Sequence, residues 1–519
     1  MAAASASSQT EVLIAGAGPT GLVLALWLTR LGVAVRIIDK TAEPGTTSRA
    51  VAVAAHTLEL YEQLGLASAV VAQGHAVRCV HLWVKGRPAA EVLLGDIGRG
   101  LSRFGPMQIF PQDAHERLLV QRLEESGIRV ERCTELMNLS ATGAGVESRL
   151  RTPDGREQHV LAKFLAGCDG AHSTVRHLIN AGFAGGTYRQ LFYVADADAE
   201  GAAANGDLHI DLDEADFLAV FPLSADGRVR VIGTVRDERA ASAQTLTFDD
   251  VSHQTLRDFD IRIRNVNWFS TYHVHHRVTE RFRLGSVFLL GDAAHVHSPV
   301  GGQGMNTGIG DAINLAWKLA AVIGGGAPDA LLDSYAIERR RFAKRLVATT
   351  DRVFTFVTAD GPLARQVRTR VAPRVVPGLF GMHPVRKFLF RTVAQLSLQY
   401  RHSPLSEGVA GAVHGGDRLP WAGSDADNFA PLRDPRWQVH VYGTAAAALA
   451  QWCRDHRLPL HVFPWQPAYA ACGLTQGALY LLRPDTYVAL AGAEASPALL
   501  DSYFQRQRIR PQLAATTVA

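Results

Sequence analysis

The chain has 519 residues, 47% of them apolar, and its formal net charge is only +4. This length is too great for one ordinary hydrophobic core, so two or three domains are expected. The small charge and the lack of long Lys/Arg runs argue against nucleic acid as a partner, and no run of about 18 apolar residues exists that could span a bilayer.

The N-terminus and the cysteines indicate the cellular compartment. The first ten residues, MAAASASSQT, have no charged region followed by an apolar stretch, so we expect no signal peptide and a disordered tail over 1–10. An odd number of scattered cysteines without a CxxC pair predicts neither a disulfide scaffold nor a zinc site, and it fits a reducing cytoplasm. They are Cys79, Cys133, Cys168, Cys453 and Cys472.

A dinucleotide-binding motif follows the tail. The stretch EVLIAGAGPTGLVLALWLTRLGVAVRIIDK contains an apolar strand, G-x-G-x-x-G at Gly16, Gly18 and Gly21, an apolar-faced helix, and a second strand that ends in Asp39. Gly16 permits a tight turn, Gly18 lets a pyrophosphate approach the main chain, and Gly21 lets the helix pack closely on the strand. The helix N-terminus offers N–H groups to the phosphates. Asp39 can accept hydrogen bonds from both ribose hydroxyls, which favours FAD or NAD over NADP.

A second motif, KFLAGCDGAHSTVRHLI, places Asp169-Gly170 after another short apolar strand. Ser173 and Arg176 follow. Arg176 could hold a neighbouring carboxylate or a phosphate, or it could be an ordinary charge at the start of a helix. By itself this motif is weak.

Between 181 and 276 the pattern alternates between apolar and polar residues, as in HIDLDEADFLAVFPL and RVRVIGTV, which predicts a β-sheet with Gly and Asp turns. The stretch TYHVHHRV predicts a strand with His273 and His275 on one face and His276 on the other. Together with His295 and His297 these histidines raise the question of a metal. No ligating trio with a carboxylate is evident among them, so no metal site is predicted.

A third motif begins at Val287 and reads VFLLGDAAHVHSPVGGQGMNTGIGDAINLAWKLA. A strand ends in Gly291-Asp292, a glycine-rich loop follows, and an apolar helix is expected to begin near Gly308. Two Gly/Asp strand ends that lie far from the G-x-G-x-x-G motif indicate one extended ligand held at three places.

The three motifs together resemble the class A flavin-dependent aromatic hydroxylases, which include p-hydroxybenzoate hydroxylase and the phenol 2-monooxygenases. The resemblance extends from about Glu11 to Arg345, and more weakly through the C-terminal region. It implies an α/β fold: a Rossmann-like FAD-binding domain with an inserted β-sheet substrate domain and a C-terminal thioredoxin-like domain. The implied boundaries are 11–180 and 277–345 for FAD binding, 181–276 for the substrate sheet, 346–402 for connecting helices and 403–519 for the thioredoxin-like domain, which lacks CxxC.

The resemblance also implies which residues hold a tightly bound FAD. Asp292 would bind the ribityl chain, which Gln112 would approach, Asp169 would lie near the pyrophosphate and the groove for NAD(P)H, and Arg49 would lie along the FAD. Asp39 stands where Glu is more common in this family, and His56 stands where related phenol hydroxylases have Arg. The full predicted set is Gly16, Gly18, Pro19, Thr20, Gly21, Asp39, Lys40, Arg49, Gln112, Asp169, Gly170, Asp292, Pro299, Gly302, Gly304, Met305 and Asn306.

The glycine-rich loop is expected to run under the isoalloxazine ring. Glycines let main-chain groups come within hydrogen-bonding distance of the ring nitrogen and oxygen atoms, and the following helix would direct its N-terminal dipole at the pyrimidine end. The resemblance implies that NADPH or NADH reduces FAD and that O₂ then forms a flavin C4a-hydroperoxide, which hydroxylates a phenolic or polyketide-like aromatic substrate. The carbonyl of Pro299 would lie near the reacting ring.

Tyr272 or His273 is a candidate for orienting or deprotonating the phenol; ordinary strand packing is the alternative. Two other functions stay open: a flavin-dependent reductase or dehydrogenase without oxygen insertion, and a non-catalytic partner-binding protein on the same fold. The basic and apolar segment from Arg370 is interpreted as a helical layer or subunit interface in preference to a membrane-surface helix. The C-terminal domain is expected to have a structural or homodimer-forming role.

Overall fold

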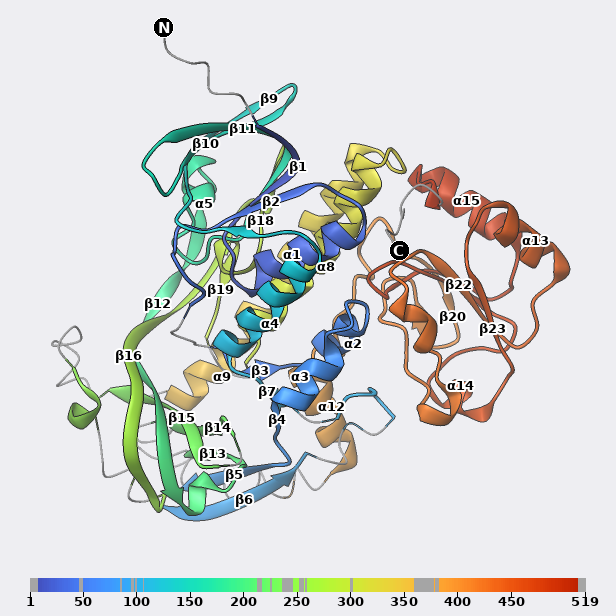
Figure 1. The fold of residues 1–519 in the computed structure, drawn as a ribbon. Helices are drawn as coiled ribbons and strands as arrows, with labels where there is room; N and C mark the ends of the chain where they lie inside the picture. The colour runs from blue at the N-terminus through green and yellow to red at the C-terminus, as the bar shows by residue number, and fades with distance from the viewer. Residues whose placement is uncertain are drawn as a thin grey trace, which may run out of the picture.

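The computed structural model describes residues 8–511, apart from several gaps (Figure 1). The gaps are 46–49, 85, 95–97, 99, 106, 212–216, 225, 236–245, 252–255, 257–258, 299–301, 359–377 and 379–381. Most of the expected N-terminal tail therefore lies outside the described residues. Its last three residues differ from the expectation, because Ser8–Thr10 already pair with the neighbouring strand, Ser8 opposite Val160.

The first sheet is mainly parallel and has the strand order β17-β18-β11-β1-β2-β8, with β9 and β10 added as an antiparallel extension. Strands β18, β11, β1 and β2 run parallel, and β1 at the centre is fully buried from Val12 to Ile14. The strands are β1 Ser8–Ala15, β2 Val35–Ile38, β8 Val130–Glu131, β9 Glu135–Thr142, β10 Gly145–Arg151, β11 Glu157–Gly167, β17 Arg283–Leu284 and β18 Val287–Leu289. A near-continuous apolar run is what a strand buried on both faces requires.

Helices α1 (Pro19–Arg30), α4 (Gln112–Glu125) and α8 (Gly304–Ile323) pack together beside this sheet (Figure 1). The helix α8 is apolar around most of its surface, because it lies between α1 on one side and α9 (Asp333–Thr358) on the other. Shorter helices complete this part: α2 Ala55–Glu62, α3 Ala67–Gln73 and α5 Thr174–Leu178. A small sheet of β3 Ala52–Val53, β4 His75–Ala76 and β7 Gln108–Ile109 lies beside α2 and α3.

The second sheet has the order β19-β16-β12-β15-β14-β13-β5-β6. Its two 19-residue strands β12 and β16 pair along their length and connect the two sheets (Figure 1). The strands are β5 Cys79–Val84, β6 Arg87–Leu93, β12 Phe183–Gly201, β13 Leu208–Asp211, β14 Leu218–Pro222, β15 Arg228–Val235, β16 Ile261–Thr279 and β19 His295–Val296. The sequence analysis assigned β5 and β6 to the FAD-binding part; they instead extend this sheet, because β13 pairs with β5.

The two faces of the second sheet have different surroundings. On the inner face Val80 and Phe221 pack in one cluster with Val51 and Ala52, which belong to the first part of the molecule. On the outer face Trp83 packs in a separate cluster with residues of the segment 246–261. Other inner-face residues are Phe192, Val194, Ile232, Tyr272 and Val274, and other outer-face residues are Cys79, His81, Tyr193, His209, Val220 and Val231. The inner face is therefore the one that packs against the small sheet of the first part of the molecule.

The C-terminal sheet has the order β21-β20-β25-β24-β22-β23. Within it, β22-α13-β23-α14-β24-β25-α15 forms a sheet with the order β23-β22-β24-β25, which is the arrangement of a thioredoxin-like domain and confirms the predicted fold class. The elements are β20 Glu407–Ala410, β21 Val413–His414, β22 Gln438–Tyr442, α13 Ala447–Asp455, β23 Leu460–Phe463, α14 Pro467–Ala471, β24 Leu479–Leu482, β25 Val488–Gly492 and α15 Pro497–Gln507. All five cysteines are free thiols.

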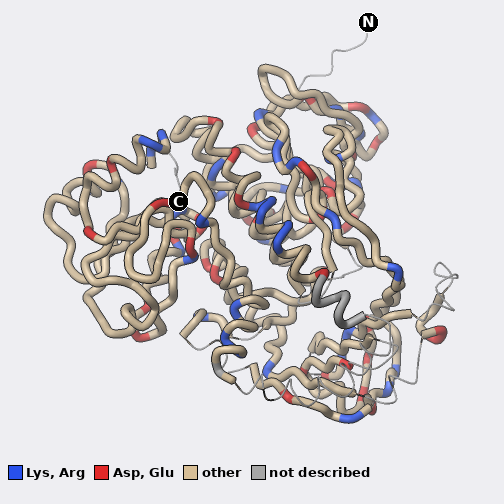
Figure 2. The backbone as a smooth tube through the Cα atoms, turned by 180° about the vertical axis from the view of Figure 1, so that it is seen from behind, with Lys and Arg blue, Asp and Glu red and all other residues tan. Residues whose placement is uncertain are grey.

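Buried polar contacts join this domain to the rest of the chain. Arg418 forms an ion pair with Glu59 of α2, and the Gln63 amide donates to the carbonyls of Leu432 and Pro484. Helix α12 (His383–Val393) belongs to the connecting region, of which 359–377 and 379–381 lie outside the described residues. Positive and negative residues are interspersed along the backbone in the view of Figure 2. No helix in the described ranges is both long and apolar enough to cross a bilayer.

Candidate flavin-binding site

The predicted motifs meet at one edge of the first sheet. Because β18, β11, β1 and β2 are adjacent and parallel, their carboxyl ends lie side by side. Asp292 follows β18, Asp169 follows β11, Gly16 follows β1 and Asp39 follows β2. Ligands of open α/β sheets bind outside the carboxyl ends of the strands. The structure thus brings together residues that are up to 276 positions apart in the sequence, from Gly16 to Asp292.

The three glycines of the first motif have different roles. Gly16 has φ +104°, and a Cβ there would overlap the carbonyl oxygen of Cys168 in the next strand. A Cβ on Gly21 would overlap the carbonyl oxygen of Gly16. A Cβ on Gly18, in contrast, would meet no atom within 4 Å. The first and third glycines are therefore required by protein packing, whereas the second leaves open space in front of the N-terminus of α1.

Thr20 joins the first motif to the third. Its side chain lies against Gly291 and Gly308, and a Cβ on either glycine would collide with the Thr20 hydroxyl. Pro19, at the first position of α1, is buried. Thr20 was predicted to contact the cofactor; its described contacts place it between two motifs of the protein.

Asp39 lies where a ribose-binding acid is expected. Its Oδ2 accepts a hydrogen bond from the Ala17 N–H at 2.7 Å, and its Oδ1 accepts from the N–H and hydroxyl of Thr41 at 2.8 and 2.7 Å. These bonds fix the carboxylate beside the glycine loop while leaving it half-buried. The neighbouring Lys40 is exposed.

The second motif is attached to the third through Arg176. Its guanidinium donates to the carbonyls of Ala293 and Ala171 at 2.9 and 2.8 Å and lies over the Phe183 ring, with 4.0 Å between guanidinium carbon and ring centroid. Ser173 caps α5 by accepting from the Arg176 N–H. Arg176 is therefore buried and links two loops through main-chain carbonyls, a role that neither interpretation of the sequence named. Gly170, at φ +78°, forms the turn that follows Asp169.

A buried charge network holds the third motif, and the sequence analysis missed it. Asp311 of α8 is fully buried and accepts from the Gly291 N–H at 2.9 Å, while the Asp311 carboxylate also contacts His295 at 2.8 Å and Arg339 at 2.5 Å. Burial alone would raise the pKa of Asp311, but Arg339 and His295 outweigh burial and keep it below its usual value. The signal was present, since Asp311 is an acid within an apolar helix. The Asp292 side chain is left exposed at the sheet edge.

Helix α8 begins at Gly304 rather than near Gly308, so the prediction of its start was wrong. Gly308 and Gly310 lie inside the helix. Thr20 packs against Gly308 and Arg339 packs against Gly310, so there is little space for a side chain at either position. Met305 is partly buried against the main core in the first turn. The N-cap residue Gln303 sends its side chain away from the helix, to the Val393 carbonyl and the Gln395 amide.

Asn306 has a structural role in the first turn of α8. Its amide oxygen accepts from the Ala54 N–H and the Thr57 hydroxyl, and its amide nitrogen donates to the carbonyls of Ala52 and Gly302. Asn306 therefore holds the segment from Ala52 to Thr57 against the glycine-rich loop. Gly302 has φ +62° and faces the Ala52 methyl group. Arg49 and Pro299 of the predicted set lie outside the described residues.

Among the residues that the structure describes, three buried polar atoms in the loops of the second and third motifs have no hydrogen-bond partner. They are Asp169 Oδ1, His297 Nε2 and Ser298 Oγ. Burial lowers the pKa of His297 to about 4, so this ring is neutral. Buried polar atoms without partners are rare in folded proteins, and a bound ligand is one reason for them. Together with the open space at Gly18, they fit a cofactor that runs along the edge, and the acid at Asp39 fits the adenosine ribose of FAD.

The other predicted residues divide between the two parts of the molecule. Gln112 is the first residue of α4, and its amide donates to Glu116 at 2.8 Å. Tyr272 lies on the inner face of the second sheet, with its ring 6.1 Å from that of Phe192. His273 lies on the outer face and is exposed, so it points away from the flavin side. His56 contacts Tyr487 and Glu59, and therefore faces the C-terminal domain.

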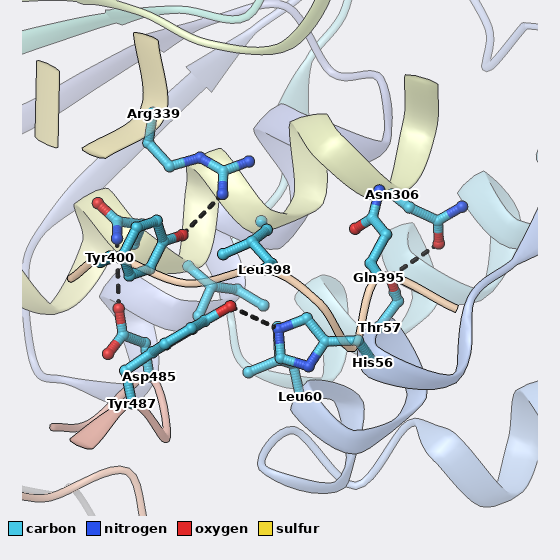
Figure 3. Close-up of a pocket in the computed structure, with 13 residues that line it drawn as sticks. His56, Thr57, Leu60, Asn306, Arg339, Gln395, Leu398, Tyr400, Asp485 and Tyr487 are labelled. Atoms are coloured by element: carbon cyan, nitrogen blue, oxygen red, sulfur yellow. Dashed lines mark hydrogen bonds between the residues drawn. The ribbon is translucent and has the colours of Figure 1, made fainter. Parts of the chain in front are cut away.

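A small cavity lies between α2, α8, α9 and the C-terminal domain (Figure 3). His56 and Tyr487 point toward one another across it, 3.0 Å apart between ring nitrogen and hydroxyl, and Arg339 donates to Tyr400. Its volume of about 10 Å³ is enough for one water molecule and far too small for an aromatic substrate. The cavity is thus part of the domain junction.

The sequence matches the model of the FAD binding domain family over residues 9–350. It is 33% identical to 6-methylpretetramide 4-monooxygenase of Streptomyces rimosus, with 97% of this chain and 94% of the relative covered. It is 30% identical to pentachlorophenol 4-monooxygenase of Sphingobium chlorophenolicum, with 80% and 76% covered.

Among solved structures, the OxyS anhydrotetracycline hydroxylase from Streptomyces rimosus superposes with a TM-score of 0.77 at 28% identity, covering 96% of this chain and 99% of that one. The matches extend over the C-terminal domain as well as the FAD-binding part. The chain belongs to the class A flavin-dependent aromatic hydroxylases and is an FAD-dependent monooxygenase that uses NAD(P)H and O₂ to hydroxylate an aromatic substrate.

Proposed function

We propose that this monooxygenase hydroxylates a phenolic ring of a polycyclic aromatic polyketide. The observation that carries the proposal is the aromatic inner face of the second sheet, which faces the first part of the molecule. Phe192 lies at its centre, with ring centroids 6.4 Å from Phe217 and 6.1 Å from Tyr272. Phe221 and Trp268 pack against the same cluster. Flat apolar rings of this kind fit several fused aromatic rings better than one small phenol.

The relatives support the same substrate class. The curated relative that matches over nearly the whole chain is named for 6-methylpretetramide, and the OxyS structure is that of an anhydrotetracycline hydroxylase. Pentachlorophenol 4-monooxygenase, which is named for a single-ring phenol, covers less of the chain at lower identity. Fold similarity alone does not determine a substrate, so the proposal depends on the inner face.

FAD, when bound, supplies the redox chemistry with NAD(P)H and O₂. The residues of the chain supply binding and orientation. We assign the ribose to Asp39, the pyrophosphate to the N-terminus of α1 at Gly18, the ribityl chain to Asp292, and the ring to the loop before α8. The N-terminus of α8 places a positive dipole end at that loop, which favours the anionic reduced ring. Tyr272 is assigned to the substrate hydroxyl.

The test uses the purified holoprotein with NADH or NADPH and two substrate panels. One panel contains tetracyclic and angular polyphenols, and the other contains single-ring phenols. We expect substrate-dependent NAD(P)H oxidation with the polycyclic panel, and a product that carries one oxygen atom from ¹⁸O₂ by mass spectrometry.

Turnover confined to single-ring phenols would contradict the substrate class while leaving the monooxygenase assignment intact. Oxidation of NAD(P)H without ¹⁸O in any product, with both panels, would instead favour a reductase or dehydrogenase.

We also propose that the enzyme is a cytoplasmic homodimer that uses the C-terminal domain for structure or association. Light scattering coupled to gel filtration measures the mass of the holoprotein directly. A mass of one chain at micromolar concentration would contradict the dimer.

A further inference from the structure

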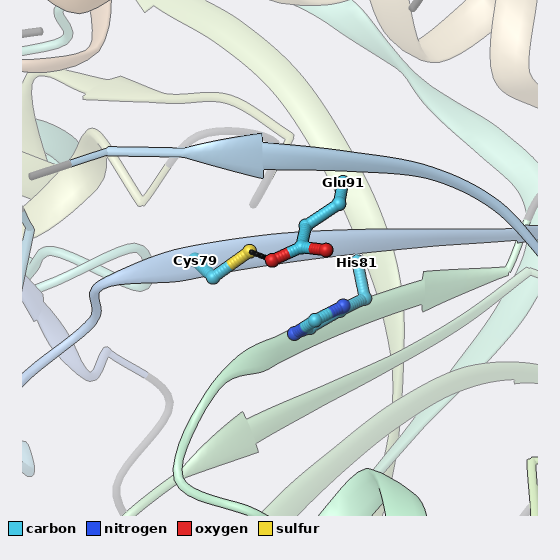
Figure 4. A group of neighbouring side chains, drawn as sticks. All are labelled: Cys79, His81 and Glu91. Carbon is cyan, nitrogen blue, oxygen red and sulfur yellow. Dashed lines mark hydrogen bonds between the residues drawn. The ribbon is translucent and has the colours of Figure 1, made fainter.

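Three potential metal ligands gather on the outer face of the second sheet, on the side turned away from the flavin. Cys79 and His81 lie on β5, two residues apart and therefore on one face, and Glu91 of β6 is directly opposite His81. Figure 4 shows the three side chains pointing toward one another across the two strands. The monooxygenase reaction uses none of them.

The distances suit a common cation. The Cys79 Sγ lies 3.4 Å from Glu91 Oε1, and one ligand atom from each residue lies within 4.8 Å of the other two. Zinc bonds of about 2.0–2.3 Å require ligand atoms separated by roughly 3.3–3.8 Å in a tetrahedron. Small side-chain rotations close the difference, because Glu91 is exposed and His81 is half-buried.

His81 is oriented as metal-binding histidines usually are. Its Nε2 pairs with Asp207 Oδ2 at 3.1 Å, which leaves Nδ1 for a cation, and Asp207 is itself held by the Cys79 N–H at 3.2 Å. A carboxylate on the second ring nitrogen is the common support for a histidine ligand. The His209 ring stacks on His81 with centroids 4.6 Å apart. Both His209 nitrogens are already bonded, to Trp83 and Asn205, so His209 supports the site rather than binding the cation.

The charge of the group also favours a cation. Two carboxylates, Glu91 and Asp207, lie beside the thiol, and in the described part of the chain no lysine or arginine forms an ion pair with either one. A divalent cation would neutralise this charge. Its binding to the thiolate would release the Cys79 proton to solvent.

We propose that Cys79, His81 and Glu91 bind a divalent cation of the zinc class, with water in the fourth position. A mixed set of sulfur, imidazole and carboxylate ligands suits zinc and disfavours magnesium and calcium. The cation holds the edge strand β6 and the β5–β13 junction together. Val80, between two of the ligands, packs on the inner face with Ala52, so the site also steadies the wall of the substrate side.

The test measures zinc bound by the full-chain holoprotein after dialysis from excess zinc chloride. We expect one zinc ion per chain by mass spectrometry of the metal, and at least about 100-fold weaker binding for C79S and E91Q. D207N is expected to weaken binding by roughly 10–100-fold, because it removes only the support of His81. C133S and H273Q, which change an exposed thiol and an exposed outer-face histidine, serve as controls and should bind zinc normally.

The flavin absorbance of each variant reports whether it has folded. If C79S does not fold, E91Q still decides, because Glu91 is exposed, and zinc should raise the melting temperature of the wild type but not of E91Q. Holoprotein that retains no zinc overturns the proposal. Equal zinc binding by the wild type and by C79S and E91Q overturns it as well.

Discussion

The carboxyl edge of the first sheet and the junction with the C-terminal domain both contain buried polar groups, but they satisfy them differently. At the predicted flavin site, Asp169 Oδ1 and His297 Nε2 are buried without a partner among the described residues. At the junction, Glu338 accepts from Lys318 and Arg483, and all three side chains are fully buried. Unpaired buried atoms at the first place fit a ligand-binding site, whereas the paired charges at the second place join two domains. One molecule thus uses unpaired buried groups for ligand binding and paired buried charges for the association of its domains.

The junction should therefore respond to the loss of one charge with the largest change in stability. Replacing Arg483 with Met leaves Glu338 and Asp485 without their shared partner, and breaking a buried ion pair costs about 3–5 kcal/mol. Burial alone would raise the pKa of Glu338, but Arg483 and Lys318 hold it below its usual range. Urea unfolding followed by fluorescence measures the expected loss.

The matched control is Arg436→Met, which removes an ion pair with Asp434 in the same domain. Both side chains of that pair are about 40% exposed, at 43% and 39%, so we expect a loss below about 1 kcal/mol. Equal losses in the two variants would show that burial of the Arg483 network contributes nothing, and the contrast between the two regions would fail.

A substitution at the sheet edge should have the opposite effect: it should weaken FAD binding and leave the free energy of unfolding almost unchanged. In Gly18→Val the new side chain meets no protein atom at its Cβ, so the apoprotein should keep its unfolding free energy within about 1 kcal/mol. The same side chain occupies the space for the pyrophosphate, and we expect FAD affinity to fall at least about 100-fold, or about 2.7 kcal/mol. Fluorescence titration of the apoprotein with FAD measures the affinity.

Gly21→Val provides the comparison, because its Cβ would overlap the Gly16 carbonyl. That variant should lose both stability and FAD. If Gly18→Val binds FAD as tightly as the wild type, the open space at Gly18 does not hold the phosphates.

The flavin-binding part should also be sensitive to acid through His115. This ring is buried in α4, its Nε2 lies 2.8 Å from the Tyr61 hydroxyl, and burial lowers its pKa to about 3 from an ordinary 6.5. Between these values the unfolded chain binds more protons than the folded chain, so stability falls as the pH drops below 6.5, by about 1.4 kcal/mol per pH unit for this group. His115→Gln should reduce that slope in unfolding measured from pH 7 to pH 4.

The wild type gives the reference for acid sensitivity. Identical curves for His115→Gln and the wild type would show that protonation of His115 does not drive the loss.

The sequence predicted the parts of this site that depend on main-chain geometry. Gly16, Gly21 and Asp39 have the positions that the motif required, because a tight turn and a strand end leave a local pattern. The start of α8 was misplaced, since Gly308 looks like a loop residue until Thr20 is packed against it. A local pattern does not contain contacts between motifs that are hundreds of residues apart.

The same limit explains two further misses. Strand β5 pairs with β13, which lies more than 100 residues later, and β6 pairs with β5, so the place of these two strands in the second sheet could not be predicted from local sequence. The Cys79, His81 and Glu91 group lies on the β5–β6 pair, but Asp207, which supports His81, is brought to it by the pairing of β5 with β13. The histidines between 273 and 297 are close together in the sequence, but they are divided between the two faces of the sheet. Tyr272 and His273 are neighbours in the chain but lie on opposite faces of the sheet. The choice between them as the residue that contacts the substrate therefore also depends on the structure.

The smallest expected effect is on kcat/KM, for substitutions on the two faces of the second sheet. Tyr272 is on the inner face beside Phe192, and removing its hydroxyl with Tyr272→Phe should lower kcat/KM for the hydroxylated substrate about tenfold, or 1.4 kcal/mol, if that hydroxyl bonds the phenol. His273 is exposed on the outer face, so His273→Gln should change kcat/KM by less than about twofold. Steady-state NAD(P)H oxidation, corrected for uncoupled peroxide formation, measures both. A tenfold loss in His273→Gln with none in Tyr272→Phe would reverse the assignment of the faces, and with it the argument that aromatic substrate meets the flavin from the inner side.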